Sequence, residues 1–261
     1  MKRPIKRLLL KILQLTLGQA RRLRCYVIKT MVWVEQDASP RESIRWLLEI
    51  HDFVGGFIDQ QCIRWGNGVH IKHELMDGIH SFFYERIPAG SHVLDVGCGI
   101  GAVAYSIVTH TDAHVVGVDL AEWSLAFAQD RFKHPNLQFV LGDATKSLAI
   151  KRVDVVVLSS VLEHIPTRIE LLKTLIDRFH PHLFLVRVPT FERHHFAALK
   201  RELGLFPYTD PSHLLEYSPE SFAVEMNQAG LDIRYMEIRW GDIWAECIPR
   251  CTTMDSDHEA S

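Results

Sequence analysis

From residue 91 onward, short apolar runs alternate with longer segments in which apolar side chains recur every three or four residues. The runs have the length and β-branched content of buried strands, and the longer segments have helical periodicity. Strands that alternate with helices predict an α/β domain with a doubly wound, mostly parallel sheet. Strands are expected at 92–96, 114–119, 137–141, 153–158, 182–188, 231–239 and 242–248, and helices at 101–110, 121–132, 166–179 and 218–229.

The region before the first strand carries helical patterns instead. Ser39 precedes a proline and is followed three residues later by a glutamate, a combination typical of a helix start. We expect this helix to cover residues 40–52 and to end at Gly55-Gly56. A second helix is expected at 70–87, where a Pro-Ala-Gly sequence stops it.

Charge is distributed unevenly along the chain. No Asp or Glu precedes Glu35, whereas nine Lys or Arg residues do, so the remainder carries 20 basic and 32 acidic residues. Apolar residues between 5 and 17 recur at helical spacing among these cations, which predicts a basic amphipathic helix. This stretch is too short and too polar to cross a bilayer, which needs about 20 apolar residues.

Three interpretations of the basic segment are open: contact of residues 1–24 with an anionic membrane, packing on its own domain or a partner, and mitochondrial targeting. Peripheral contact with the inner face of the cytoplasmic membrane is the working hypothesis. The acidic remainder of the chain argues against nucleic acid as a partner. Five cysteines, with no CxxC pair or Cys/His zinc spacing, indicate a reducing, cytoplasmic compartment and lead us to assign no metal site.

The strongest local signal follows the first predicted strand. Residues 93–101, Val-Leu-Asp-Val-Gly-Cys-Gly-Ile-Gly, join an apolar run to a glycine loop, and a helical pattern follows. Glycines let the backbone approach a ligand closely, and the helix N-terminus points at that ligand. Doubly wound domains use such a turn to bind nucleotide-like cofactors.

Two acids occupy the ends of the next two strands. Asp119 lies about 20 residues beyond the glycine loop, at the position from which a carboxylate accepts hydrogen bonds from a ribose diol. Asp143 follows the third strand and can accept a hydrogen bond from the amino group of an adenine ring. The loop and both acids in register predict a site for an adenosine-containing cofactor.

These features resemble the class I S-adenosylmethionine-dependent methyltransferases. Residues 93–101 match the first motif of that family, Asp119-Leu120 the ribose-binding acid, Gly142-Asp143-Ala144 the adenine segment, and Leu162-Glu163-His164 a frequent step after the fourth strand. The resemblance implies a Rossmann-like, seven-stranded sheet with an antiparallel last strand, and S-adenosyl-L-methionine as the cofactor. It implies the following cofactor-binding residues: Asp95, Gly97, Cys98, Gly99, Gly101, Asp119, Leu120, Asp143, Ala144 and Ser159.

A nicotinamide-dependent dehydrogenase is the competing interpretation, because residues 97–102 also fit the pattern G-x-G-x-x-A. The third glycine at 101, the acid after the third strand and the helical segment before the first strand favour the methyltransferase. On that basis the chain divides into a basic amphipathic segment, a helical extension on the substrate side, the methyltransferase domain and a flexible tail, at 1–34, 35–90, 91–248 and 249–261.

Methylation of a hydroxyl requires a group that removes its proton, and a histidine with a near-neutral pKa suits that task. His164 follows the fourth strand at the carboxyl edge of the sheet, where ligands bind. His213 lies in Asp210-Pro211-Ser212-His213, a loop that resembles the substrate-side segment of the family. Glu163 can orient His164 or cap a helix. We predict His164, His213 and Glu163 as catalytic residues, with a structural role as the alternative for each histidine.

The acceptor is suggested by the segment from Trp65 to Phe83, which is similar to methyltransferases of bacterial surface-polysaccharide synthesis. With the basic N-terminus, it suggests O-methylation of a glycan or lipid-linked sugar. A small aromatic or quinone-like metabolite is the alternative acceptor, and a non-catalytic cofactor-binding partner of a synthase complex is the alternative of another class. Aromatic residues expected around the mouth of the site are Trp65, Phe82, Phe83, Tyr84, Phe191, Phe206, Tyr208 and Tyr217.

Overall fold

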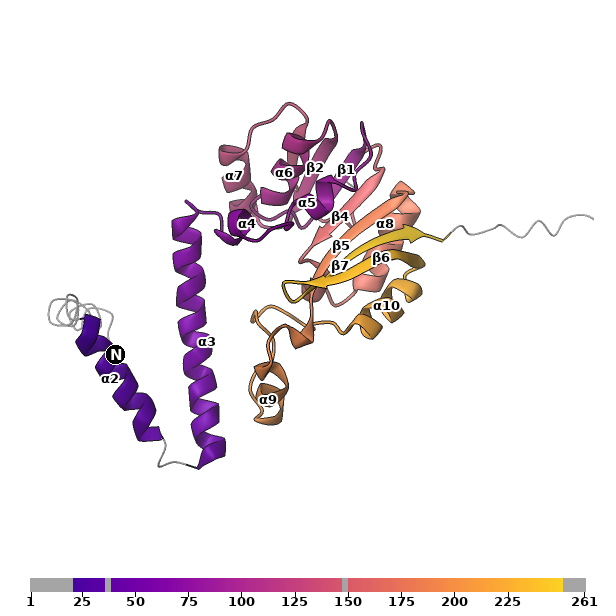
Figure 1. Ribbon diagram of the computed structural model, residues 1–261. Helices are drawn as coiled ribbons and strands as arrows, with labels where there is room; N and C mark the ends of the chain where they lie inside the picture. Colours follow the sequence, from indigo (N-terminus) through magenta and orange to yellow (C-terminus); the bar gives the residue numbers. More distant parts are fainter. Residues whose placement is uncertain (1–20, 36–38, 147–149, 251–261) are drawn as a thin grey trace, which may run out of the picture. The chain divides into compact units, whose positions relative to one another are not determined.

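A seven-stranded sheet forms the centre of the computed structural model, which describes residues 21–35, 39–146 and 150–250 (Figure 1). The strand order is β3-β2-β1-β4-β5-β7-β6, with β1 to β5 parallel and β7 antiparallel to both of its neighbours. The predicted Rossmann-like fold, including its antiparallel last strand, is confirmed. The strands are β1 (His92–Val96), β2 (His114–Asp119), β3 (Leu137–Leu141), β4 (Val155–Ser159), β5 (Leu183–Pro189), β6 (Leu231–Arg239) and β7 (Asp242–Pro249).

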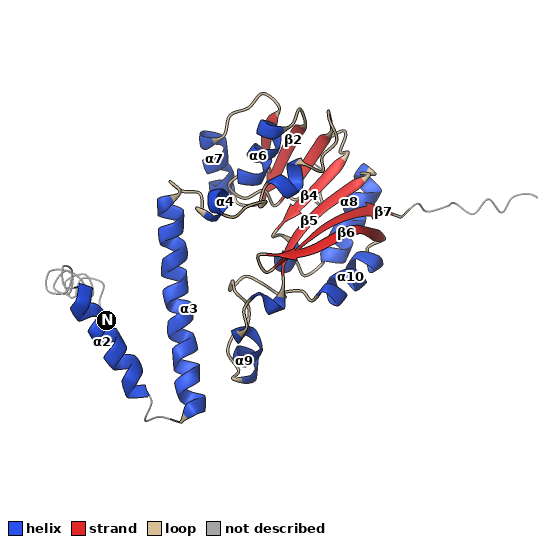
Figure 2. Ribbon diagram, viewed as in Figure 1, coloured by secondary structure: helices blue, strands red, loops and turns tan. Residues whose placement is uncertain are grey.

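Helices cover both faces of this sheet (Figure 2). The helices of the described residues are α2 (Arg21–Val34), α3 (Pro40–Trp65), α4 (Lys72–Leu75), α5 (Ser81–Tyr84), α6 (Ala102–His110), α7 (Glu122–Arg131), α8 (Arg168–Phe179), α9 (Phe196–Glu202) and α10 (Pro219–Gln228), with the 3₁₀ turns η2 (Leu162–His164) and η3 (Phe191–Arg193). The boundaries of α6, α7, α8 and α10 differ by no more than about two residues from those expected from periodicity, whereas α9 was not predicted.

Alternation along each central strand divides the core into two layers. Val156 and Leu158 of β4 belong to the layer that contains the apolar side chains of α8 and α10. Val155 and Val157 belong to the opposite layer, with those of α5, α6 and α7. All four are fully buried. A strand buried on both faces reads as a continuous apolar run, as the sequence of β4 does.

The long helix α3 differs from the prediction. It starts at Pro40 with Ser39 as its cap, since the Glu42 N–H donates to Ser39 Oγ over 3.4 Å. It does not end at Gly55-Gly56 but continues to Trp65. No atom lies within 4 Å of a Cβ added at either glycine, and each glycine costs a helix only about 1 kcal/mol relative to alanine. Two glycines are therefore too weak a signal to end a helix of this length.

The single helix expected at 70–87 is also wrong, because the chain forms the short helices α4 and α5 with a turn between them. Gly78 in this turn has φ +73°, and a Cβ there would lie 2.3 Å from Arg239 Nη1. Arg239 Nη2 donates to the Gly78 carbonyl over 3.2 Å, and Trp240 Nε1 donates to the Asp77 carbonyl over 3.1 Å. These contacts from β6 and the following turn hold the backbone in a conformation that helical periodicity does not reveal.

The chain forms two compact units. The smaller contains the described residues up to 58 together with 200–205, and the larger contains residues 59–199 and 206 onward. Within the smaller unit, Lys200 Nζ lies 2.6 Å from Asp52 Oδ1, and Arg41 Nη2 donates to the Glu202 carbonyl over 3.1 Å. The sheet and all of the residues predicted to bind cofactor or to act in catalysis belong to the larger unit.

Asp95 is a carboxyl group inside the sheet. It lies on β1, is 1% exposed, and its Oδ2 has no hydrogen-bond partner among the described residues. Burial, together with the negative charge of Asp119, raises its pKa from 3.8 to about 8. The folded protein therefore holds this proton at neutral pH, whereas the unfolded chain has lost it.

Asp95→Asn should remove a pH dependence of stability. Between pH 4 and pH 8 the folded state binds one proton more than the unfolded state at this site, so this group makes the free energy of unfolding fall as pH rises. The neutral amide should therefore gain in thermal midpoint relative to the wild type between pH 5 and pH 8. Asp130→Asn, on the exposed surface of α7, is the control. A midpoint difference that stays constant over this pH range would contradict the assignment.

Candidate functional site

The turn between β1 and α6 is a tight glycine loop. The N–H groups of Gly97 and Cys98 both donate to the Val118 carbonyl, over 2.8 and 3.1 Å, and the Gly101 N–H donates to the Cys98 carbonyl over 2.9 Å. Gly97, Gly99 and Gly101 have φ values of +65°, +52° and +79°. L side chains rarely adopt this left-handed conformation, which explains the glycine at each position.

The three glycines differ in what surrounds them. A Cβ at Gly97 would lie 2.8 Å from Val161 Cγ2, and one at Gly101 would lie 2.5 Å from Phe139 Cζ. Around Gly99, no protein atom lies within 4 Å of an added Cβ. Gly97 and Gly101 thus allow close packing, whereas Gly99 leaves open space beside the backbone of the loop.

Asp119 ends β2, and its side chain accepts hydrogen bonds from the loop after β1 and from the loop after β2, at the carboxyl edge of the sheet. Its Oδ2 accepts the Gly99 N–H and its Oδ1 accepts the Ala121 N–H, each over 2.8 Å. Its own carbonyl accepts the Gly142 N–H over 3.0 Å. Each carboxylate oxygen can accept two hydrogen bonds, so one position on each oxygen stays available for a ligand.

Asp143 follows β3 at the same edge, because Asp119 and Leu141 are partners in the sheet register. Its Oδ1 accepts the hydroxyl of Thr145 over 2.6 Å and the Thr145 N–H over 2.9 Å. These hydrogen bonds, the hydroxyl first, hold the pKa of the Asp143 carboxyl below its usual range. The carboxylate is thus ionised at neutral pH, and Thr145 fixes its orientation.

A cavity of about 580 Å³ opens between these loops and the segment after β4. This is within the volume range of small-molecule sites. Of the ten residues predicted to bind cofactor, Gly97, Asp119, Leu120, Asp143 and Ala144 line it, and the predicted catalytic residue His164 does so too. Asp95, Cys98, Gly99, Gly101 and Ser159 are not among its lining residues within the described part of the chain.

Several lining residues were missed by the sequence analysis. Ser160 lines the cavity in place of Ser159, because β4 ends one residue later than expected. Its φ is +58°, unusual for a residue other than glycine, and its N–H donates to the Arg187 carbonyl over 2.9 Å. Pro166 and Thr167 complete the wall. The Ile-Pro-Thr sequence after His164 signals a turn, but no sequence pattern says which side chains face a cavity.

The structure brings the three predicted catalytic residues together. Glu163 and His164 lie on η2, and His213 lies on the loop before α10. The Leu214 N–H donates to the Glu163 carbonyl over 2.8 Å, and His164 Nδ1 lies 3.1 Å from Ser212 Oγ. The rings of His164 and His213 meet edge to face with centroids 4.8 Å apart.

Glu163 is an unpartnered carboxyl group in this cluster. Its side chain is fully buried, and neither Oε1 nor Oε2 has a hydrogen-bond partner among the described residues. It neither orients His164 by a hydrogen bond nor caps a helix, so both sequence-based roles for it are wrong. Burial raises the pKa of Glu163 to about 7, against the opposing effects of its own backbone N–H and of the His213 charge.

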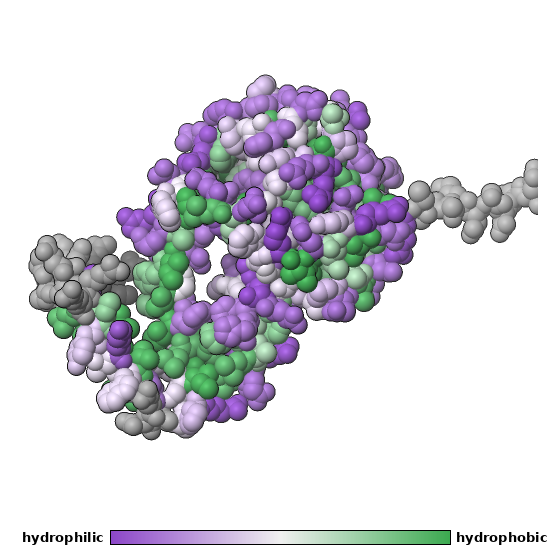
Figure 3. Space-filling model, in the orientation of Figure 1, coloured by the Kyte–Doolittle hydropathy of each residue, from purple (hydrophilic) through white to green (hydrophobic). Residues whose placement is uncertain are grey.

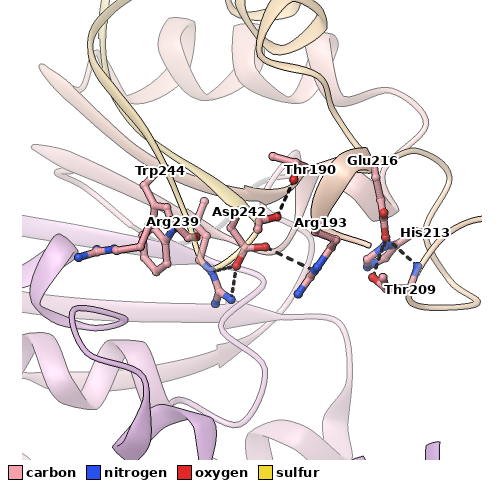
Figure 4. A network of polar contacts seen from close by, with 10 residues as sticks. Thr190, Arg193, Thr209, His213, Glu216, Arg239, Asp242 and Trp244 are labelled. Atoms are coloured by element: carbon pink, nitrogen blue, oxygen red, sulfur yellow. Dashed lines mark hydrogen bonds and ion pairs between the residues drawn. The ribbon is translucent and has the colours of Figure 1, made fainter. Parts of the chain in front are cut away.

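His213 is oriented by a second carboxylate (Figure 4). Its Nδ1 lies 2.9 Å from Glu216 Oε1, which also accepts the Thr209 N–H and hydroxyl over 2.8 and 2.7 Å. This bond leaves Nε2 of His213 as the nitrogen that can meet a ligand. Burial, then the charge of His213, lowers the pKa of His164, so its imidazole is neutral at pH 7.

A second group of buried charges centres on Asp242, which Figure 4 shows together with Arg193. Arg187 Nε and Nη2 lie 2.8 and 2.6 Å from Asp242 Oδ2, and Arg193 Nη1 lies 3.4 Å from Asp242 Oδ1. Arg187 and Asp242 are 5% and 1% exposed. Their charges act on the pKa of Glu163, the arginine lowering it and the aspartate raising it. Nothing in the sequence pattern pointed to Arg187 or Asp242.

The predicted aromatic mouth is corrected by the structure. Phe82 and Phe83 are buried against Trp244, with ring centroids 5.2 and 5.9 Å from it, and Tyr217 is fully buried beside Phe222. These rings form core. Their burial follows from the helices α5 and α10, whose apolar faces close the sheet. The prediction is therefore wrong for Phe82, Phe83 and Tyr217, whereas Trp65 and Phe206 are 69% and 48% exposed and stay candidates.

Comparison with known proteins agrees with this architecture. Residues 69–235 match a family model described as a methyltransferase domain. The chain is 28% identical to the ubiquinone biosynthesis O-methyltransferase of Acinetobacter baumannii over 158 residues, which is 57% of this chain and 66% of that protein. It is 41% identical over 64 residues to a sterol 24-C-methyltransferase of Gibberella zeae, covering 23% of this chain and 17% of that protein. The chain thus spans about a fifth to two thirds of the length of such relatives.

Solved structures show the same fold at low sequence identity. The magnesium protoporphyrin IX methyltransferase of Synechocystis, with bound S-adenosyl-L-homocysteine, has a TM-score of 0.55 at 19% identity, over 73% of this chain and 87% of that one. An O-methyltransferase of neocarzinostatin biosynthesis, in complex with S-adenosyl-L-homocysteine and 1,4-dihydroxy-2-naphthoic acid, also has a TM-score of 0.55, at 20% identity, over 69% of this chain and 55% of that one.

Proposed function

We propose that this chain, a member of the methyltransferase domain family, is an S-adenosyl-L-methionine-dependent enzyme that methylates a hydroxyl group of a glycan or lipid-linked sugar. The observation that carries the hydroxyl acceptor is the cluster of Glu163, His164 and His213, whose ligand atoms all lie within 4.8 Å of one another. His164 also lines the cofactor cavity. A hydroxyl there meets groups that can accept its proton.

The cavity fits S-adenosyl-L-methionine on two counts. Asp119, which lines the cavity, keeps one acceptor position on each oxygen, as binding of the ribose diol requires. Gly99 does not line the cavity, but it belongs to the same loop as the lining residue Gly97 and has open space where a side chain would stand. We assign the adenine end to Asp143 and Ala144. The bound donor supplies a methyl group already activated by the sulfonium, so this chain's residues have to align the acceptor, exclude water and remove a proton.

A glycan hydroxyl is favoured by the polar character of the acceptor side. Carboxylates and imidazoles of Glu163, His213 and Glu216 gather there, while the aromatic rings of Phe82 and Tyr217 are committed to the core. Hydroxyl-rich acceptors are bound through such polar groups. A phenolic, quinone-like acceptor is the second candidate, favoured by the similarity to the ubiquinone biosynthesis O-methyltransferase of Acinetobacter baumannii.

Transfer of a labelled methyl group tests the acceptor class. Full-length protein would be offered nucleotide sugars, lipid-linked glycans and dihydroxy-aromatic compounds together with methyl-labelled S-adenosyl-L-methionine. We expect label on a sugar hydroxyl. His213→Ala should lower turnover by roughly 10²- to 10⁴-fold, the usual contribution of an acid–base group. His134→Ala, on the loop between α7 and β3, should leave turnover unchanged.

Label on aromatic compounds alone would overturn the glycan proposal in favour of the second candidate. Release of S-adenosyl-L-homocysteine with any acceptor argues against a non-catalytic cofactor-binding partner. If the protein binds the donor but releases no S-adenosyl-L-homocysteine with any compound offered, the proposal that it is an enzyme is contradicted.

Gly99→Ala should weaken donor binding, and Gly90→Ala is its matched control. Both glycines have positive φ, +52° and +69°, and neither has an atom within 4 Å of an added Cβ. Each substitution should therefore cost about 1–2 kcal/mol of stability through backbone strain. Only Gly99→Ala places a methyl group in the open space of the loop after β1. Calorimetric titration with S-adenosyl-L-homocysteine should show weaker binding for Gly99→Ala alone, and equal affinities would contradict this placement of the donor.

We propose that the N-terminal region contacts a membrane surface peripherally. Residues 1–20, where the predicted amphipathic helix lies, are outside the described residues. In α2, Tyr26 and Trp33 are each 68% exposed, and in α3 Phe53 is 65% exposed. Figure 3 shows apolar side chains at the surface in this part of the chain. Within residues 21–35, 39–146 and 150–250, no helix is long and apolar enough to cross a membrane. The exposed apolar side chains of α2 belong to a segment, residues 1–34, whose sequence has nine Lys or Arg and no Asp or Glu, a combination that favours an anionic lipid surface.

Deletion of residues 2–24 should release the protein from anionic vesicles, because it removes eight of the nine N-terminal cations. The measurement is co-sedimentation with vesicles that contain anionic lipid, with purely zwitterionic vesicles as the control. Replacing Lys2, Arg3, Lys6 and Arg7 by Glu should have the same effect without shortening the chain. Undiminished binding of either variant to anionic vesicles would refute the membrane contact.

A further inference from the structure

We infer that Glu163, His164 and His213 bind one divalent transition-metal ion at the edge of the cofactor cavity. The set comprises two imidazoles and one carboxylate, with one ligand atom of each within 4.8 Å of the others. This combination is a recurrent site for first-row divalent metals that keeps further coordination positions open for a substrate. Ligand atoms on a tetrahedral ion at 2.1 Å are about 3.4 Å apart, so modest side-chain rotations would close the site.

The unpartnered carboxylate is the first independent argument. Glu163 is fully buried, and neither of its oxygens receives a hydrogen bond from any described residue. Leaving a buried carboxyl group without partners is costly. Its neighbours His164 and His213 offer nitrogen atoms at the same place, and a cation between the three would satisfy the carboxylate.

The surroundings of His213 are the second argument. Histidines that bind metals usually donate their other ring N–H to a carboxylate, which sets the tautomer and the ring orientation. His213 has this arrangement, with Nδ1 2.9 Å from Glu216 Oε1. Glu216 is in turn held by the N–H and hydroxyl of Thr209, over 2.8 and 2.7 Å. A rigid second carboxylate thus presents Nε2 of His213 as a ligand atom.

The position of the site indicates what the ion does, and this part of the inference rests on the proposed methylation of a hydroxyl. A hydroxyl bound to the ion has a lowered pKa and gives its proton to solvent water. Its oxygen then forms a bond to the methyl carbon of the donor while the carbon–sulfur bond breaks, and that electron pair stays on sulfur. The products are the methyl ether and uncharged S-adenosyl-L-homocysteine.

Titration of the full-length chain with Co²⁺ tests the site directly. After treatment with a chelator, and with donor and acceptor left out, Co²⁺ binding is followed by visible absorption. We expect one ion per chain at this site. Glu163→Gln and His213→Ala should each weaken binding at least 10-fold, and Glu216→Gln by roughly 10- to 100-fold through the orientation of His213. His134→Ala should bind Co²⁺ as the wild type does.

Calorimetry with S-adenosyl-L-homocysteine provides the folding control, because a variant that retains this affinity is folded. Co²⁺ binding that is undetectable in the wild type, or equal in the wild type and in folded Glu163→Gln and His213→Ala, would overturn the inference. In the methyl-transfer assay, chelation should abolish turnover and added Co²⁺ or Mn²⁺ should restore it. If turnover persists after chelation, the metal site is refuted and the proposed function stands. If Co²⁺ binds as expected but no hydroxyl compound accepts the methyl group, only the proposed function is refuted.

Discussion

The loops around the cofactor cavity depend on the hydrogen bonds of one residue, Asp119. One oxygen accepts the N–H of Gly99 and the other that of Ala121, so a single side chain joins the turn after β1 to the turn after β2. Its backbone carbonyl extends the connection to the turn after β3 through Gly142. Three loops that are separate in sequence are thus held at one edge of the sheet, and the cavity is the space between them.

Parallel strands make this arrangement possible. Each strand from β1 to β5 ends at the same edge, so every loop that leaves that edge can contribute to one site. The antiparallel β7 contributes the first residue of a strand to this edge, because β7 starts where β5 ends. This residue is Asp242, which pairs with Pro189. The carboxylate of Asp242 then neutralises Arg187, which would otherwise be an unpaired charge buried in the sheet.

The cluster of Glu163, His164 and His213 has a different character from the glycine-loop side. Its groups come from η2 and from the loop before α10, which are joined by the hydrogen bond from the Leu214 N–H to the Glu163 carbonyl. Most of its charges are partnered, as His213 is by Glu216 and Arg187 by Asp242. Glu216 and Asp242 each leave one oxygen without a hydrogen bond, but Glu163 leaves both, and such a buried group is where a ligand is expected.

The amino-acid sequence alone determined the order of strands and helices in the sheet region, the glycine loop and the acids Asp119 and Asp143, because these depend on local periodicity and on turns that need glycine. It failed at α3, where two glycines did not end the helix, and at Gly78, whose turn is held by Arg239 from β6. The meeting of Glu163 with His213, the role of Ser160 in place of Ser159, and the Arg187–Asp242 pair were decided only by tertiary structure. Such contacts join positions that are distant in the chain, and no local pattern encodes which side chains the sheet will bring together.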